Sequence, residues 1–469
     1  MKKIAKFLIV LGMMGQLSSC DYLDIVPDER AQESDTWKTE GAVRGYLYSC
    51  YGYLPANRTF GNSYWLAEEL TAVTKELFTT FKYGYYSPVS LGFTSNTWST
   101  IWNGIHQCYM FQESLKQVSN EYVTDEMKKQ YLAESNFLIA YYHFLSMRSY
   151  GPTMIIRSVI DLETPISGFP ERSSIDEVVA FINEKLDEAM SEGGLPTTWS
   201  GKDYGRATRL AALALKSRVY LYAASPLYNG NTEMYADFRS PLDGRQLIAQ
   251  EKSQAKWEIS ATQTKYAIDE VEKAKFHLYH DADAGEPSDA KPGLPNKAQR
   301  RLRYTNIDNQ TGNNPEIIWA DTRNDDYYGI QRRCPPRQTL GGKFAGISMT
   351  NCPTLQTIEA FYTKNGLPIN KDKTFDYDER YEYISAPENC DGNNYEDLVK
   401  YANFTPSSDK VMRLCTDREP RFYAWTTYHN GYFEFGKYNN EEISADPAKR
   451  AIRIHLLRDC LLYTSDAAD

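Results

Sequence analysis

The longest regular pattern in the sequence is a series of helical segments between about residues 35 and 278. Apolar residues recur there at three- and four-residue spacing, and turn residues separate the segments. The expected helices are Thr36–Leu54, Thr97–Val118, a helix from Thr124 to Gly151, Ser174–Met190, the alanine-rich segment that begins at Gly205, and Ser253–Phe276. Helix pairs of similar length joined by short turns are typical of helix-hairpin solenoids. The sequence therefore predicts a mainly α fold built from helix pairs, although it contains no strict repeat.

Two of these helices carry clear start signals. Thr124 precedes two acidic residues, which the positive end of a helix dipole favours. Ser174 and Glu177 form the spacing of a capping box, in which each side chain satisfies a backbone N–H group of the other residue. Within the first of these helices, a core-facing stripe is expected. It comprises Phe137, Leu138, Tyr141, Phe144, Leu145 and Arg148.

The character of the chain changes after residue 280. Residues 281–301 are rich in proline, glycine and charge, as in a linker or surface loop. Short strand-like runs follow, notably Glu316–Ala320 and Phe422–Thr427. This half is predicted to be irregular and rich in loops, as binding surfaces often are.

The N-terminus reads as an export signal. Three lysines precede an apolar run from Phe7 to Leu17, which is too short for a bilayer span of roughly 20 residues. The run ends in Leu-Ser-Ser-Cys, which resembles the bacterial lipobox. We expect residues 1–19 to be removed and the Cys20 thiol to carry diacylglycerol, with palmitate-type chains giving stable anchoring. The alternative is an ordinary thiol behind a plain export signal.

Charge and aromatic content narrow the class of ligand. Without the three lysines of the signal, 49 basic residues face 62 acidic ones (52 minus 3, against 62), a net charge of about −13. An acidic surface argues against nucleic acid, whose binding depends on phosphate contacts from Lys and Arg. The 36 tyrosines, 19 phenylalanines and 8 tryptophans suit sugars, which stack on aromatic faces and hydrogen-bond to hydroxyls. Many of these rings are expected to pack between helices instead.

The cysteines do not indicate a metal site. Six remain when Cys20 and Cys460 are set aside, and none forms a CxxC or zinc-like spacing. These are Cys50, Cys108, Cys334, Cys352, Cys390 and Cys415. Export permits disulfides, but their pairing is not readable from the sequence. Oxygen donors at 391–394 suit calcium, but they lack the spacing of an EF-hand loop, so a turn is the better interpretation. No cofactor is expected.

Several phrases, in order along residues 20–455, resemble the SusD/RagB family of outer-membrane lipoproteins from Bacteroidetes. They are "CDYLDIVPDE", "TWSTIWNGIHQC", "AESNFLIAYYHFLSMRSYGPTMII", "INEKLDEAMSEGGLP", "GRATRLAALALKSRVYLYAASPLY", "NPEIIWADTRND", "PTLQTIEAFYTKNGLPI" and "DREPRFYAWTTYHNG". The chain departs from the family at Ile139-Ala140, where an Arg-Ala pair is common.

The resemblance implies a tetratricopeptide-like helix-pair scaffold and a large irregular, loop-rich ligand-binding region carrying a few short strands. It places the helical region at 20–280 and the second region at 281–459. It also implies a protein of the cell outer membrane that faces the exterior, has no catalytic activity, and delivers captured oligosaccharide to a SusC-like TonB-dependent barrel. Peptide binding within the same family is the alternative.

Two other functions are alternatives to glycan capture. A surface glycoside hydrolase needs two carboxylates about 5–9 Å apart, for which Glu68-Glu69 and Asp325-Asp326 are available. Acidic pairs are expected by chance in so acidic a chain, and no hydrolase or nucleotide-binding motif occurs. His277 and His280 beside acidic residues fit a solvated helix end better than a metal cluster. A purely structural scaffold is the second alternative, because helix-pair proteins usually bind proteins.

The ligand is expected to contact aromatic loops rather than helices. The candidate ligand-binding residues are Asn62, Tyr64, Trp65, Tyr83, Tyr85, Tyr86, Tyr327, Tyr328 and Arg332. Trp98 and Trp102 lie four residues apart on an expected helix, so core packing is the better interpretation for both.

The last ten residues, 460–469, do not fit the rest of the chain. "CLLYTSDAAD" resembles the translated read-through of a sequencing adapter, and the last portion usual in the family is missing after about residue 458. We expect a non-native tail that replaces helices completing the scaffold. Loss of such terminal units would expose apolar surface. The alternative is a genuine short member of the family with a polar tail.

Overall fold

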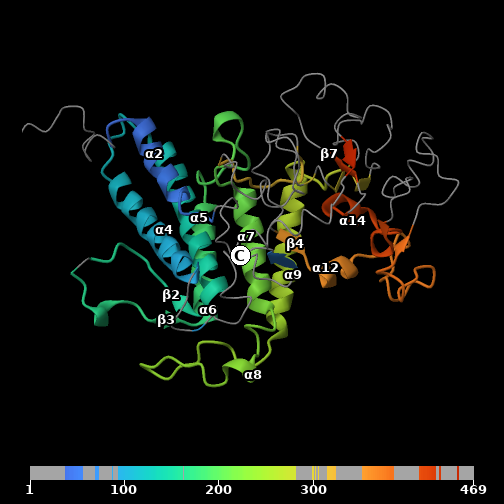
Figure 1. The fold of residues 1–469 in the computed structure, drawn as a ribbon. Helices are drawn as coiled ribbons and strands as arrows, with labels where there is room; N and C mark the ends of the chain where they lie inside the picture. Colours follow the sequence, from blue (N-terminus) through green and yellow to red (C-terminus); the bar gives the residue numbers. More distant parts are fainter. Residues whose placement is uncertain are drawn as a thin grey trace, which may run out of the picture. The chain divides into compact units, whose positions relative to one another are not determined.

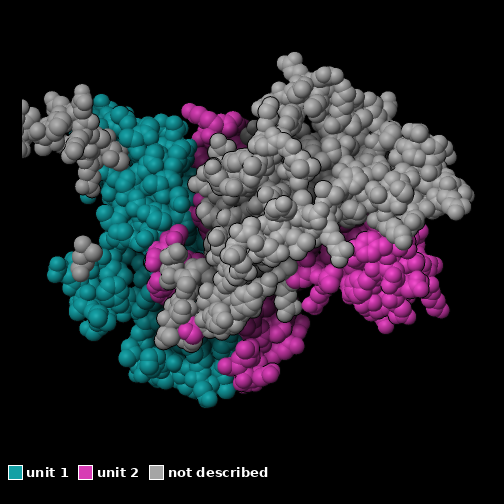
Figure 2. Space-filling view, in the orientation of Figure 1, with its two compact units in different colours: residues 1–53, 101–195, 235–249 teal, residues 54–100, 196–234, 250–469 magenta. Residues whose placement is uncertain are grey.

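The structure is a computed structural model of the chain. It describes residues 37–55, 69–72, 87, 93–161, 163–280, 298–299, 301–302, 305, 314–323, 351–384, 411–428, 432–434 and 451–453. The chain divides into two compact units, each built from separate stretches of sequence (Figure 2). Unit 1 comprises residues 1–53, 101–195 and 235–249, and unit 2 comprises residues 54–100, 196–234 and 250–469. The predicted boundary at 280/281 adjoins residues outside the described part and stays a prediction.

Unit 1 is helical, as the sequence predicts (Figure 1). Its helices are α2 (Glu40–Tyr51), α4 (Phe93–Leu115, in this unit from Ile101), α5 (Asp125–Tyr150) and α6 (Ile175–Ala189). The central helix is α5, which buries every residue from Ala133 to Met147 except half-buried Tyr141. The predicted core stripe is therefore mostly correct, although the buried surface of α5 extends beyond it. The last residue of the stripe, Arg148, is exposed. A helix surrounded by others buries all its faces.

The predicted starts of α5 and α6 are confirmed. Thr124 caps α5 by accepting a hydrogen bond from the Met127 N–H, and Gly151 follows the helix with a φ of 72°. Ser174 and Glu177 form the capping box of α6. Two starts are shifted by four residues, since α2 begins at Glu40 rather than at Thr36 and α4 begins at Phe93 rather than at Thr97.

A small hairpin-like sheet completes the described part of unit 1. Strand β2 (Thr153–Met154) pairs antiparallel with β3 (Arg172–Ser173), with Thr153 opposite Ser173. The connection between the two strands contains the short 3-10 helix η3 (Ile166–Gly168).

Unit 2 contains a helix pair and several short elements (Figure 1). The pair is α7 (Arg209–Ala224) packed on α9 (Gln254–Lys273). Helix α7 buries four of its alanines, whose small side chains let a neighbouring helix approach closely. They are Ala211, Ala212, Ala223 and Ala224. Short helical elements among the described residues are η4 (Gly201–Asp203), α12 (Leu355–Ala360), η5 (Arg413–Cys415) and α14 (Pro420–Trp425), and α8 (Thr232–Tyr235) belongs to this unit up to Met234.

Six short strands of unit 2 form three separate antiparallel pairs. They are β1 (Leu70–Ala72) with β4 (Asn351–Pro353), β5 (Tyr383–Ile384) with β6 (Val411–Met412), and β7 (Tyr432–Glu434) with β8 (Ala451–Arg453). The mainly α prediction with a few short strands is therefore correct. Among the described residues, no helix combines the length and apolar character needed to cross a bilayer.

Two predicted strands are wrong. Residues 422–425 belong to α14, because Pro420 occupies the first helical position, where its fixed φ favours a helix. Residues 316–320 form turns, since the Asn314 side chain accepts a hydrogen bond from the Glu316 N–H at 3.1 Å and starts an Asx turn. In both places a local turn or cap overrides the strand propensity of the apolar residues.

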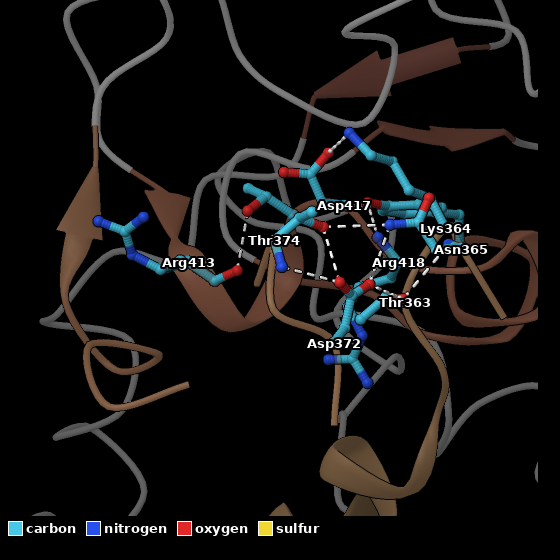
Figure 3. A network of polar contacts seen from close by, with 10 residues as sticks. Thr363, Lys364, Asn365, Asp372, Thr374, Arg413, Asp417 and Arg418 are labelled. Carbon is cyan, nitrogen blue, oxygen red and sulfur yellow. Dashed lines mark hydrogen bonds and ion pairs between the residues drawn. The ribbon is translucent and has the colours of Figure 1, made fainter. Parts of the chain in front are cut away.

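Residues 351–384 and 411–428 of unit 2 form a small core and a buried polar network (Figure 3). Ile369, Phe375 and Leu414 form the core. Beside it, the Asp372 carboxylate accepts hydrogen bonds from the Thr363 hydroxyl at 2.6 Å and from the Thr374 hydroxyl at 2.7 Å. These hydrogen bonds keep the pKa of Asp372 well below its usual range. The network fixes the irregular backbone where regular elements are short.

Candidate functional site

Described residues line a cavity within unit 2. Its volume is about 390 Å³, within the range of small-molecule sites. Three stretches of chain line it, namely 197–208 before α7, 274–276 after α9, and the turn 314–320. The cavity is thus built by loops that the α7–α9 pair holds in place.

Two tryptophans of the cavity are fixed by the same short segment of backbone. The Trp199 indole N–H donates to the Ala207 carbonyl at 2.8 Å, and the Trp319 indole N–H donates to the Gly205 carbonyl at 2.8 Å. Gly205 has a φ of 97°, and a Cβ there would lie 2.7 Å from the Thr322 methyl group, so glycine is required. Both indole rings are therefore oriented before any ligand arrives.

A buried arginine packs against one of these rings. The Arg206 guanidinium lies 4.0 Å from the centroid of the Trp199 ring and pairs with the Asp203 carboxylate at 2.8 Å. Arg206 is only 8% exposed. A buried charge held by a carboxylate and an aromatic face is rigid, so it fixes Trp199 further.

The polar groups of the lining are mainly hydroxyls. Thr197, Thr198, Ser200, Tyr204 and Thr208 contribute them. Burial raises the pKa of Tyr204, so its phenol stays neutral at physiological pH. The Asn314 amide is engaged with backbone, because its NH₂ group donates to the Thr305 carbonyl at 3.0 Å. The described lining residues include no Asp or Glu.

The far side of the cavity is made by the turn after α9. Lys275 has a φ of 71°, the left-handed conformation that ends many helices. Its N–H donates to the Glu272 carbonyl at 2.9 Å, and the Phe276 N–H donates to the Val271 carbonyl at 3.2 Å. This turn brings the half-buried Phe276 side chain into the cavity wall.

The arrangement joins aromatic faces, neutral hydroxyls and a buried cation around one cavity. Such a surface can stack on an apolar face of a ligand and hydrogen-bond to its hydroxyl groups. It lacks, in the described lining, the pair of carboxylates that glycosidic hydrolysis requires. The chemistry favours binding of a polyhydroxylated ligand.

The residues predicted from the sequence as ligand contacts all lie outside the described residues. They are Asn62, Tyr64, Trp65, Tyr83, Tyr85, Tyr86, Tyr327, Tyr328 and Arg332. The predicted lipidation site Cys20 lies outside them as well. These assignments stay predictions.

Some residues of the alternative hydrolase and metal-site interpretations lie in the described part of the chain. Glu68, Asp325 and Asp326 lie outside the described residues, and Glu69 is exposed. The His277 and His280 rings stack at 5.3 Å, and the described part of the chain holds no group of three or more metal-ligating side chains.

The two tryptophans assigned to core packing lie on α4. Trp98 and Trp102 are both half-buried. The Trp102 ring meets the buried His143 ring edge to face at 6.0 Å.

Sequence reasoning did not single out Trp199, Arg206 or Trp319 as ligand contacts. The first two stand in loop sequence directly before the alanine-rich helix, and Trp319 was assigned to a strand. A pair of loop tryptophans separated by more than 100 residues carries no local signal of proximity. The hydrogen bond from Trp319 to Gly205 is what brings them together.

Comparisons with known proteins give a consistent result. Residues 21–221 match the family model SusD-like_3, described as starch-binding associating with outer membrane, and residues 315–452 match the SusD family model SusD_RagB. No curated protein matches the chain.

Among solved structures, the protein BT4246 is similar to this chain with a TM-score of 0.66 and 28% identity, over 85% of this chain and 66% of its own. A SusD-like protein from Bacteroides fragilis has a TM-score of 0.60 and 19% identity, over 91% of this chain and 65% of its own. The chain thus spans about two thirds of the length of each of these relatives.

Proposed function

This chain belongs to the SusD/RagB family, and on that basis we propose that it is a cell-surface lipoprotein that captures an oligosaccharide. It hands the captured glycan to a SusC-like TonB-dependent barrel in the outer membrane. The observation that carries the proposal is the cavity between Trp199 and Trp319, which offers two preset indoles and neutral hydroxyls. The description of the matched family model, which names starch binding at the outer membrane, supports the same ligand class.

The physical fit between the cavity and a sugar has two parts. The C–H faces of a pyranose ring stack on an indole, and aromatic stacking on nucleic-acid bases, a related interaction, is worth roughly 1–3 kcal/mol per platform. The threonine and serine hydroxyls of the lining both donate and accept, as sugar hydroxyls do. Because the indoles are held by backbone carbonyls, binding loses little side-chain entropy.

We propose that the protein binds the glycan without hydrolysing it. A glycoside hydrolase of either type needs a proton donor and a second carboxylate at the scissile bond. Neither Asp nor Glu is among the described residues that line the cavity. We therefore expect the bound glycan to dissociate from the protein without being cleaved.

The test is binding of the soluble chain, beginning at Asp21, to a panel of glycans by affinity electrophoresis. Thr197 and Thr198 are exposed lining residues, so Thr197→Lys places a long charged side chain in the cavity without disturbing a core. We expect the variant to bind the preferred glycan at least tenfold more weakly. Trp425→Ala removes an exposed aromatic side chain that is absent from the cavity lining and should leave affinity unchanged.

Equal affinity of the folded Thr197→Lys variant and the original chain would move the site elsewhere. Failure of the original chain to bind any glycan, with binding of peptides in its place, would contradict the proposal of a glycan ligand. Both results come from the same panel when it includes peptides.

The aromatic loops belong to the proposal as a second part of the binding surface. Replacement of Tyr83, Tyr86 and Tyr328 together by alanine is expected to weaken glycan binding at least tenfold. Unchanged affinity with the fold intact would discard these loops as ligand contacts.

The membrane anchor is tested separately. Cys20→Ala should release the protein from membranes or leave it unprocessed, because the lipid is attached to that thiol. Labelled palmitate that persists in the variant would exclude Cys20 as the anchor. Co-purification of the anchored protein with a TonB-dependent barrel tests the proposed partner.

A further inference from the structure

Helices α2 and α4 of unit 1 lie antiparallel and contact each other at successive turns. The Tyr46 and Phe111 rings stack with centroids 5.8 Å apart, and the Gln107 amide donates to the Ser49 hydroxyl at 3.1 Å. The residue directly after Ser49 is Cys50, and the residue directly after Gln107 is Cys108. The contacting faces of the two helices therefore carry one cysteine each.

The two thiols lie near each other. The Cys50 thiol donates to the Tyr46 carbonyl at 3.7 Å, and its proximity adds to burial in raising the pKa of Cys108. Both cysteines have no exposed surface, and both are free thiols in the structure. Two buried cysteines near each other, on helices that are far apart in sequence, are a more specific feature than a single buried cysteine.

The backbone on both sides of this contact is held by α5. The Tyr142 hydroxyl donates to the Cys50 carbonyl at 2.5 Å, and the Ser135 hydroxyl donates to the Cys108 carbonyl at 3.2 Å. Gly104 on α4 allows this approach, since a Cβ there would lie 2.8 Å from the Tyr142 ring. The folded structure thus holds both cysteine-bearing turns in fixed positions, which a bond between the two sulfurs would lock.

Two other roles for a thiol pair do not fit. A structural zinc site needs four ligands, and within the described residues no three metal-ligating side chains gather. A catalytic thiol needs access and a stabilised thiolate, whereas burial raises the pKa of Cys108 well above its usual range. The remaining chemistry of two facing thiols is the formation of a bond between them.

We propose that Cys50 and Cys108 are oxidised to a disulfide that ties α2 to α4 when the chain folds in the presence of a disulfide oxidant. One cysteine thiolate attacks the disulfide of the oxidant, which forms a mixed disulfide and releases one thiolate. The second cysteine then attacks the protein sulfur of that mixed disulfide and displaces the other half of the oxidant as a thiol. The protein loses two electrons and two protons, and the oxidant disulfide is reduced to two thiols.

The burial of both sulfurs in the folded protein determines when thiol–disulfide exchange with the oxidant can take place. Neither sulfur is accessible once α2 has docked, so the reaction precedes docking, and the folded protein then shields the bond from reductants. The crosslink closes the long loop of residues 51–107, and the loss of unfolded-state entropy grows with loop length. Export, which is part of the proposed function, places the chain where disulfide oxidants act. The chemistry itself is tested without reference to export or to glycan.

The experiment maps disulfides in the full chain. The reduced, unfolded chain is refolded in a buffer of oxidised and reduced glutathione, and free thiols are then alkylated with N-ethylmaleimide under denaturing conditions. Peptide mass spectrometry should find the Cys50 and Cys108 peptides joined, with two hydrogens fewer than the separate peptides. The melting temperature should exceed that of the chain refolded with reductant by on the order of 5 °C.

Matched variants separate the pair from the other cysteines. Cys50→Ser and Cys108→Ser should each abolish the joined peptide and the difference in melting temperature between oxidised and reduced samples. Cys352→Ser, at a free thiol of unit 2, should keep both. Recovery of Cys50 and Cys108 as alkylated thiols from the folded, oxidised chain would overturn the proposal. So would their linkage to other cysteines, or refolding that succeeds only under reducing conditions.

Discussion

At the scale of single residues, Arg418 holds the irregular part of unit 2 together (Figure 3). It is 3% exposed, and its guanidinium donates to four backbone carbonyls. The acceptors, at 2.6 to 3.3 Å, are those of Leu414, Ile358, Phe361 and Tyr362. The ring of Phe422 lies 4.8 Å from the same group. One side chain thus replaces the backbone pairing that short elements cannot supply.

Replacing Arg418 by lysine keeps the charge but removes the planar fork of donors. At least two of the buried carbonyls lose their partner, and each unsatisfied group costs about 1–3 kcal/mol. We expect Arg418→Lys to lower the free energy of unfolding by about 2–4 kcal/mol in urea titrations. Arg421→Lys, at a half-exposed ion pair with Glu419, should cost less than about 1 kcal/mol. Equal losses for the two variants would contradict the role given to Arg418.

A second residue, His143, makes unit 1 sensitive to acid. It is fully buried, and its Nδ1–H donates to the Ile139 carbonyl at 2.8 Å while Nε2 accepts from the Ile156 N–H at 3.3 Å. Both contacts suit the neutral ring. Burial lowers the pKa of His143 from 6.5 to about 4, and the charges of Lys185 and Arg157 act in the same direction.

Because the folded pKa is the lower one, the unfolded chain binds the proton first as the pH falls. The stabilising contribution of the neutral ring is complete above pH 6.5 and is lost as the pH falls towards 4. Between pH 7 and pH 5 the chain should lose about 2 kcal/mol of unfolding free energy more than His143→Gln, whose side chain does not titrate. Urea titrations at both pH values measure this difference, and parallel losses in the two proteins would count against it.

At the scale of helices, the packing of α4 on α5 depends on Gly104. A Cβ at this position would lie 2.8 Å from the Tyr142 ring, and that ring cannot move without breaking its hydrogen bond to the Cys50 carbonyl. Gly104→Ala should therefore destabilise the protein by about 1–3 kcal/mol. Gly45→Ala on α2, where nothing lies within 4 Å, should stabilise it by about 0.5–1 kcal/mol. Thermal unfolding should show shifts of opposite sign, and two shifts of the same sign would refute the packing argument.

The start of α6 provides a second test at this scale. The Glu177 N–H donates to the Ser174 hydroxyl at 3.3 Å, and the Ser174 N–H donates to the Glu177 carboxylate at 2.7 Å. Ser174→Ala should cost about 1 kcal/mol of unfolding free energy. Ser253 occupies the same position before α9 but makes no capping hydrogen bond, so Ser253→Ala should change stability by a few tenths of a kcal/mol only. A comparable cost at both positions would mean that the capping box contributes nothing.

The helices with local signals were also the ones predicted best. Thr124 and Ser174 mark their helix starts through contacts three residues away, which a sequence pattern records directly. The strand predictions at 316–320 and 422–427 failed, because Asn314 and Pro420 impose a turn and a helix start that outweigh apolar propensity.

At the scale of the whole molecule, the features that matter for function join residues distant in sequence. The cavity depends on a hydrogen bond between Trp319 and Gly205, and the cysteine pair consists of Cys50 on α2 and Cys108 on α4. Neither feature produces a periodic pattern in the sequence from which it could be predicted. The family resemblance nevertheless predicted the scaffold correctly, since it rests on phrases spread over most of the chain.

The central claim is that the protein binds a glycan and does not transform it. Isothermal titration calorimetry of the soluble chain with the glycan that the panel selects tests both parts at once. The account predicts a heat pulse after each injection that returns to baseline, and pulses that diminish as the sites fill. Heat flow that persists after each injection would reveal turnover, and the absence of saturable heat would show that no site exists. Either result would contradict the account.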